Sequence, residues 1–96
     1  VKHSQIMETT ARLVEKLGAG PGVITTQCFL TGQGKIDYIE VNPRFGGGAI
    51  LAIAAGANFP KYILSEMVGK KLRINPAGFE DNLIMLRYDE QIFLSF

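Results

Sequence analysis

The first stretch of the chain has hydrophobic residues at helical spacing. From Ser4 to Leu17, apolar side chains recur every three or four positions, with charged side chains between them. This pattern predicts an amphipathic helix. Ser4 is the expected N-cap, and Gly18 is the expected residue just past the helix C-terminus.

The next two segments have a period of two. Residues 23–31 and 36–41 are rich in β-branched residues and alternate in polarity, which predicts two strands. The sequence Gly32-Gln33-Gly34 between them predicts the turn of an antiparallel hairpin. Strict alternation would place Tyr38 on the same face as Glu40 and Asn42.

Two further helices are expected after the hairpin, followed by a second hairpin. Residues 49–55 form an apolar run without a polar side, so we expect a short helix that is buried around most of its circumference. Pro60 is a favourable first helical residue, which predicts a helix over 60–68. Residues 83–88 and 91–96 alternate about a polar pair, which predicts the second hairpin.

Composition narrows the fold class and the partners. The 96 residues are 47% hydrophobic and 20% charged, which suits one modest core in an α+β fold, an antiparallel sheet with helices packed on it. A net charge of +1 without a basic run argues against nucleic acid as a partner. No apolar run is long enough for a membrane span. The single cysteine, Cys28, fits a reducing compartment, so we expect a cytoplasmic protein.

The candidate chemistry begins at the end of the second predicted strand, in IDYIEVNPRFGGG. Glu40 and Asn42 are two residues apart on a strand and therefore project from one face. Carboxylate and amide oxygens are suitable ligands for Mg²⁺, whose other positions are filled by water or by substrate phosphates.

Gln27, on the neighbouring strand, is the third candidate ligand. With two or four residues in the hairpin loop, Gln27 lies opposite Tyr38 or Glu40, and its side chain emerges on their face. An odd loop without a bulge sends it to the other face. The register of the hairpin therefore decides whether Gln27, Glu40 and Asn42 form one cluster.

Arg44 and the glycines that follow are suited to binding an anion. A guanidinium just past a divalent-metal site can contact phosphate or carboxylate oxygens and stabilise the charge that develops during phosphoryl transfer. Gly46 and Gly47 would allow backbone N–H groups to approach such an anion, at the start of the following helix. The same glycines would also be present if the loop only needed φ angles that glycine adopts.

Together these residues resemble a known family. Gln27, the run Glu40-Val41-Asn42-Pro43-Arg44, the glycine loop and the short apolar helix are similar to the C-terminal lobe of ATP-grasp enzymes. Within that family the likeness is to the branch of the carbamoyl-phosphate synthase large subunit. It covers residues 4–70.

The resemblance implies specific roles. Glu40 would bridge two Mg²⁺ ions on ATP, with Asn42 and Gln27 as further ligands, and Mn²⁺ could replace Mg²⁺. Arg44 would hold the transferred phosphoryl group. The reaction implied is formation of an acylphosphate from a small-molecule carboxylate and ATP, followed by attack of an amine or a similar nucleophile. A neutral Gln27, where many relatives have a carboxylate, lowers the negative charge of the metal site.

The resemblance also implies what lies outside the segment. The adenine pocket, the nucleotide-binding lysines and the Gly-rich lid of the family precede the matched region, so we expect residues 1–96 to be a single partial domain. It would be inactive alone, with the N-terminal lobe of the same enzyme as its partner and a homo-oligomer as a further expected association. The alternative is a non-catalytic α+β binding or oligomerisation module that retains the fold.

Overall fold

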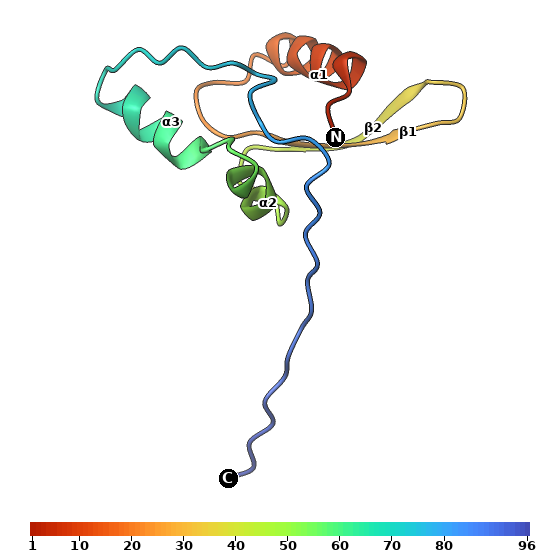
Figure 1. Cartoon of the computed structure of the whole chain (residues 1–96), viewed down its shortest axis with the longest axis vertical. Helices are drawn as coiled ribbons and strands as arrows, with labels where there is room; N and C mark the ends of the chain where they lie inside the picture. The colour runs from red at the N-terminus through yellow and green to blue at the C-terminus, as the bar shows by residue number, and fades with distance from the viewer.

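The computed structural model describes all residues 1–96. The elements in chain order are α1 (Ser4–Lys16), β1 (Thr25–Leu30), β2 (Ile36–Asn42), α2 (Ala49–Ala54) and α3 (Phe59–Met67). The fold is α+β, with one two-stranded antiparallel sheet. Helix α1 lies on one side of the hairpin and α2 on the other, with α3 beside α2 (Figure 1).

The first helix begins as predicted but with a different cap. His3 is the N-cap, and its Nδ1 accepts a hydrogen bond from the backbone N–H of Ile6 at 3.3 Å. Ser4, the predicted cap, is instead the first helical residue. The predicted end is confirmed, because Gly18 has a φ of +64°, a conformation that strongly favours glycine.

Hydroxyl groups fasten α1 to the hairpin. The Tyr38 hydroxyl lies 2.8 Å from the hydroxyls of both Thr9 and Thr10. Thr9 donates its own proton to the Gln5 carbonyl at 2.7 Å, so it accepts from Tyr38, which in turn accepts from Thr10. Tyr38 therefore faces α1.

The start of α3 also differs slightly from the expectation. The Asn58 side chain accepts a hydrogen bond from the backbone N–H of Lys61 at 3.0 Å, and the helix begins at Phe59 with Pro60 in its first turn. A proline is tolerated there because the first N–H groups of a helix have no intrahelical partner.

Two predictions about burial are wrong, namely that the chain has one modest core and that the helix over 49–55 is buried around most of its circumference. No residue of the chain is fully buried, and the surface exposed is 8213 Å² against roughly 5,400 Å² expected for a folded chain of this mass. Ile50 on α2 is 71% exposed, although the apolar run predicted burial on most sides. Leu51 on the other flank of α2 is half-buried and faces the segment that returns from α3.

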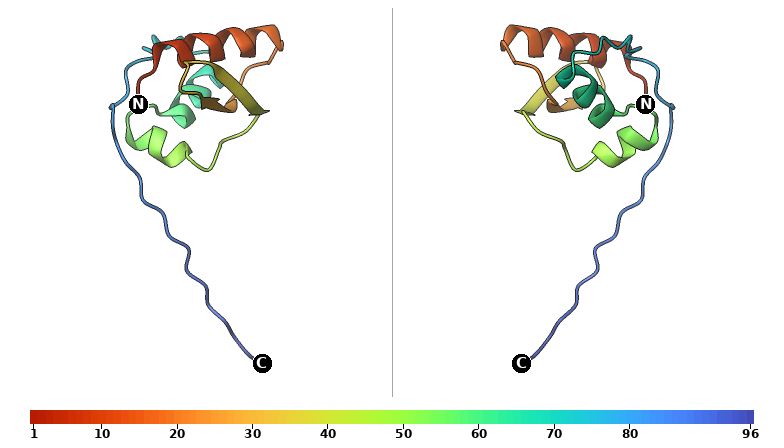
Figure 2. Two further views of the ribbon diagram at one scale, coloured as in Figure 1. Left: turned by 90° about the vertical axis from the view of Figure 1, so that its right-hand side faces the viewer. Right: turned by 90° about the vertical axis from the view of Figure 1, so that its left-hand side faces the viewer.

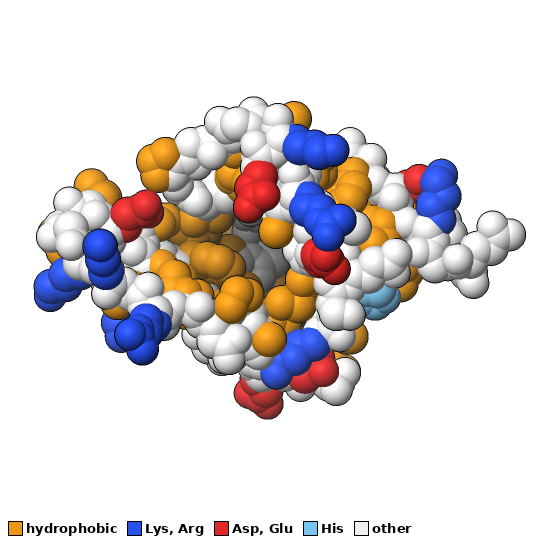
Figure 3. Space-filling view, turned by 90° about the horizontal axis from the view of Figure 1, so that it is seen from above, with side chains coloured by type: hydrophobic (Ala, Val, Ile, Leu, Met, Phe, Trp, Pro, Cys, Tyr) orange, Lys and Arg blue, Asp and Glu red, His pale blue; other side chains and the backbone are white.

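The segment that returns from α3 covers the region that most resembles a hydrophobic core. The backbone N–H of Glu80 donates to the carbonyl of Ala55, at the end of α2. Beneath it lies a cavity of about 380 Å³ lined mostly by apolar side chains, including Met7, Leu51 and Phe79. Seen from above, hydrophobic side chains surround a hollow and charged ones lie around it (Figure 3).

An acidic side chain joins the end of this segment to the start of the chain. Asp81 accepts hydrogen bonds from the backbone N–H groups of Lys2 at 2.8 Å and Asn82 at 3.0 Å. The hydrogen bond from Lys2, followed by the one from Asn82, lowers the pKa of Asp81 because each stabilises the carboxylate.

The predicted second hairpin is wrong. Residues 83–96 contain no strand, and beyond Leu83 the chain runs away from the body as an extended segment (Figures 1 and 2). Its apolar side chains are exposed, as at Leu86 and Phe93. An isolated two-stranded hairpin is marginal in water, and here no third strand or helix covers it.

Candidate functional site

A β-bulge sets the register of the hairpin. The pairs Leu30↔Ile36 and Cys28↔Tyr38 leave a five-residue loop over 31–35, which is odd. Ile39 has no partner, and the pairing resumes at Gln27↔Glu40. The extra residue puts Glu40 opposite Gln27. This is one of the two pairings that were expected for a loop with an even number of residues. Only an odd loop without a bulge would have sent Gln27 to the other face, and here the bulge compensates for the odd loop.

The bulge also corrects one predicted face. Tyr38 and Glu40 were expected on the same side, but Tyr38 turns toward α1 whereas Glu40 is exposed. One extra residue between them reverses the alternation, because the side-chain period along a strand is two. The opposite, open face of the hairpin thus carries Gln27, Glu40 and Asn42 together.

Glu40 and Asn42 are joined directly. The Asn42 Nδ2 donates to Glu40 Oε1 at 2.7 Å. This bond orients the amide so that its oxygen, Oδ1, remains free, and it leaves Oε2 of the carboxylate without a partner. Gln27 has no side-chain hydrogen bond to any other residue. Two amide oxygens and one carboxylate are therefore available on one surface.

Arg44 follows immediately. Its backbone N–H donates to the Asn42 carbonyl at 2.9 Å, and its Nη1 donates to the carbonyl of Phe45 at 3.0 Å. The side chain is exposed and forms no ion pair with any carboxylate in the chain. Its positive charge is therefore not neutralised within this segment.

The glycine loop, residues 45–48, has three carbonyls that accept hydrogen bonds and three N–H groups that are free. The carbonyl of Phe45 accepts from Arg44, that of Gly46 accepts from the backbone N–H of Ala49 at 3.0 Å, and that of Gly47 accepts from Arg87 Nη1 at 3.3 Å. The N–H groups of residues 46–48 donate to nothing in the chain. Free backbone donors of this kind can bind an anion.

Close packing against Thr25, and not the φ angle, explains why a glycine is needed at Gly46. None of residues 46–48 has a positive φ, so the interpretation that the loop needs glycine-specific angles is wrong. A Cβ on Gly46 would lie 2.7 Å from Thr25 Cγ2. The Thr25 hydroxyl donates to the Arg44 carbonyl at 2.7 Å, so this side chain is fixed against the loop.

Comparison with known protein families bears on this arrangement. Residues 1–88 match the family model described as "ATP-grasp in the biosynthetic pathway with Ter operon". The chain belongs to the ATP-grasp family. No curated protein and no solved structure matches it. ATP-grasp proteins are generally ligases that bind ATP and Mg²⁺, so the predicted family is confirmed, while the carbamoyl-phosphate synthase branch stays a prediction.

The donor set of this ATP-grasp segment is compatible with a nucleotide-bound divalent cation. Glu40, Asn42 and Gln27 offer hard oxygen atoms, which Mg²⁺ prefers. No group of three or more His, Cys, Asp or Glu side chains is placed to hold a metal ion without further ligands. A cation at this surface would therefore need the negative charge of phosphates as well, as is usual for Mg²⁺.

Sequence reasoning missed Arg87. It lies forty positions beyond Gly47 in the chain, and its guanidinium reaches the glycine loop from the extended C-terminal segment. The alternating pattern around it indicated only a strand of the predicted second hairpin. Nothing in its spacing from the E-x-N-x-R motif could have revealed the contact, because the returning segment that brings it there has no regular structure.

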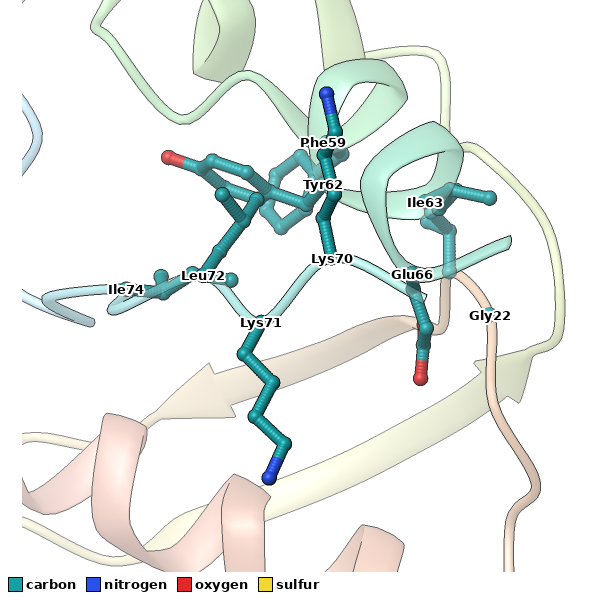
Figure 4. A pocket seen from close by; sticks show the side chains of 10 residues that line it. Gly22, Phe59, Tyr62, Ile63, Glu66, Lys70, Lys71, Leu72 and Ile74 are labelled. Atoms are coloured by element: carbon teal, nitrogen blue, oxygen red, sulfur yellow. The ribbon is translucent and has the colours of Figure 1, made fainter. Parts of the chain in front are cut away.

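The largest cavity is elsewhere. It has a volume of about 590 Å³ and lies between α3 and residues 70–74 (Figure 4). Lys70 and Lys71 extend from it in opposite directions, with Glu66 on the side of Lys71 (Figure 4). It shares no lining residue with the candidate ligands, so we do not associate it with the nucleotide. The three helices have 13, 6 and 9 residues, and none of them could span a membrane.

Proposed function

We propose that this chain supplies the magnesium- and phosphate-binding wall of an ATP-dependent ligase that activates a carboxylate as an acylphosphate. The supporting observation is the open hairpin face on which Gln27, Glu40 and Asn42 lie together, followed by Arg44 and a loop with free N–H groups. The same hairpin face in a non-catalytic module would have no need of an unneutralised arginine beside it.

Each residue has a role in this proposal. Glu40 and Asn42 hold the cation, and Gln27 supplies a neutral oxygen to it. The cation, when bound with ATP, offsets phosphate charge and orients the terminal phosphate for transfer. Arg44 contacts the transferred phosphoryl group, and the N–H groups of Gly46 and Gly47 bind phosphate oxygens. Both Mg²⁺ and Mn²⁺ are compatible with these oxygen donors.

We further propose that residues 1–96 work as part of a larger catalytic unit. The support is the large exposed surface and the absence of any buried residue, which leave many apolar side chains to be covered by another part of the enzyme. The partners would be the family's N-terminal nucleotide-binding lobe, the carboxylate substrate and its nucleophile. The branch with carbamoyl-phosphate synthase-like chemistry is one specific form of this proposal, resting on the neutral Gln27.

The proposal is tested by metal binding in the full-length protein. Mn²⁺ binding is followed by electron paramagnetic resonance in the presence of a non-hydrolysable ATP analogue, for the wild type and for Glu40→Gln and Asn42→Ala. We expect Glu40→Gln to weaken nucleotide-dependent Mn²⁺ binding about tenfold or more, since it removes the only carboxylate of the set.

Glu15→Gln is the matched control, because Glu15 is an exposed glutamate on α1 that makes no side-chain hydrogen bond or ion pair. It should bind Mn²⁺ as the wild type does. Nucleotide-dependent Mn²⁺ binding that survives Glu40→Gln unchanged would refute the ligand assignment and favour the non-catalytic module.

A further inference from the structure

The glycine loop is held by two arginines, one at the end of the E-x-N-x-R motif and one in the C-terminal segment. Arg44 Nη1 donates to the Phe45 carbonyl at 3.0 Å, and Arg87 Nη1 donates to the Gly47 carbonyl at 3.3 Å. The carbonyl between them, that of Gly46, is engaged by the backbone N–H of Ala49. Each of the loop's three peptide planes is therefore fixed by one donor to its oxygen.

Fixing a carbonyl also fixes the N–H of the next residue. In a trans peptide the C=O and N–H groups point in opposite directions from a common plane. The bond from Arg87 to the Gly47 carbonyl therefore directs the Gly48 N–H away from the guanidinium. That N–H has no acceptor in the chain.

Arg87 has no other assigned purpose in the structure. It forms no ion pair, and the apolar residues on either side of it in the extended segment are exposed. Without it, neither the C=O nor the N–H of the Gly47–Gly48 peptide would have a hydrogen bond, and a glycine on each side would restrict the orientation of that peptide little.

We propose that Arg87 is a positioning residue for the phosphate-binding loop, which holds the Gly47–Gly48 peptide so that the Gly48 N–H can donate to a phosphate oxygen of the nucleotide. This inference rests on the proposed function, and it adds a residue outside the E-x-N-x-R motif. It also gives the C-terminal segment a part in nucleotide binding.

The test measures the loop N–H groups directly. Amide hydrogen exchange of the peptide covering residues 45–49 is followed in the full-length protein, with and without MgATP, together with the dissociation constants of MgATP and MgADP. The variants are Arg87→Met, which removes the donor, and Arg87→Lys, which retains one. Arg73→Met is the matched control, an exposed arginine with no hydrogen bond to the loop.

We expect MgATP to slow exchange of the loop in the wild type, in Arg87→Lys and in Arg73→Met. In Arg87→Met the slowing should be largely lost, and MgATP affinity should fall about threefold to tenfold with no change in Tm beyond a few degrees. A loss confined to MgATP places the contact at the γ-phosphate, and an equal loss with MgADP places it at the β-phosphate.

A second variant tests the contact itself. A Cβ on Gly47 would lie 3.3 Å from Arg87 Nη1, so Gly47→Ala should displace the guanidinium. Its effect on MgATP affinity should be smaller in the Arg87→Met background than in the wild type, because the two changes then remove the same interaction.

The outcomes separate the two proposals. If Glu40→Gln abolishes Mn²⁺ binding but Arg87→Met keeps wild-type loop protection and MgATP affinity, the role of Arg87 is refuted and the proposed function stands. If MgATP leaves loop exchange unchanged in the wild type, the loop does not bind phosphate, and the role of Arg87 is refuted with it.

Discussion

Replacing Gly46 by alanine probes how the glycine loop is held against the sheet. The added Cβ would lie 2.7 Å from Thr25 Cγ2 and 3.2 Å from Thr25 Oγ1. Thr25 cannot simply rotate away, because its hydroxyl donates to the Arg44 carbonyl at 2.7 Å and its backbone is paired with Asn42. Either the loop or the hydroxyl bond must therefore give way.

The expected cost follows from these contacts. Forcing an extra methyl group into a close-packed contact typically costs about 1–3 kcal/mol. Thr25→Ser removes the methyl group at 2.7 Å and keeps the hydroxyl, so the double variant Gly46→Ala/Thr25→Ser should recover about 1 kcal/mol relative to the sum of the single changes. MgATP affinity should fall in Gly46→Ala as well, since the displaced segment includes Arg44.

The measurement is the urea midpoint of unfolding of the full-length protein, with the slope checked for constancy among variants. Gly47→Ala is the control. Its new Cβ would meet only the far end of the flexible Arg87 side chain, at 3.3 Å, so its stability should remain within about 0.5 kcal/mol of the wild type.

Two results would refute the reasoning. One is a Gly46→Ala protein as stable as Gly47→Ala, which would mean that the loop is not seated against Thr25. The other is a full cost that persists in the Thr25→Ser background, which would mean that the methyl group is not the obstacle.

Three further predictions concern the scaffold and are all measured in the full-length protein. Tyr38→Phe should lower the free energy of unfolding by about 1–2 kcal/mol, because it removes the hydroxyl that links the hairpin to α1, whereas Tyr88→Phe in the exposed C-terminal segment should be neutral. Leu51→Asp, at the half-buried flank of α2, should destabilise by about 1–3 kcal/mol more than Ile50→Asp on its exposed flank, as measured by Tm. The pKa of Asp81 is lowered in the folded chain, so the stability that its carboxylate contributes is present above the pKa of the unfolded chain and is lost as pH falls through the folded pKa. The urea midpoint, measured from about pH 6 to about pH 2, should therefore fall less steeply with decreasing pH in Asp81→Asn than in the wild type.

The positions of the elements were predictable because they depend on local signals. Helical spacing up to Leu17, alternation in the hairpin and the proline near the start of α3 each gave elements within about two residues of the observed bounds. The cap of α1 was not predictable in this way, because His3 is an unusual N-cap and Ser4 is a common one.

The residues on the open face of the hairpin were predicted from the sequence, but the bulge that brings them together was not. The sequence indicates Gln27, Glu40 and Asn42 as a set, yet whether they meet depends on the bulge at Ile39, which no residue type marks. Ile39, the unpaired residue, is 56% exposed. A bulge is a property of the pairing between two strands, and single-strand periodicity does not contain it.

The C-terminal segment shows the opposite case, a local pattern without the structure it predicts. Residues 83–96 alternate as strands do, but a strand forms only when its backbone groups find an edge and its apolar face finds a cover. The sheet has only two strands, and residues 83–96 pair with neither of them, while Arg87 in this segment contacts the glycine loop. The structure contains the tertiary contact of Arg87 with the glycine loop but not the strands that the alternation of residues 83–96 predicted. For the same reason Arg87 was the functional candidate that sequence reasoning could not find, since its position depends on where the chain returns and not on what surrounds it in the sequence.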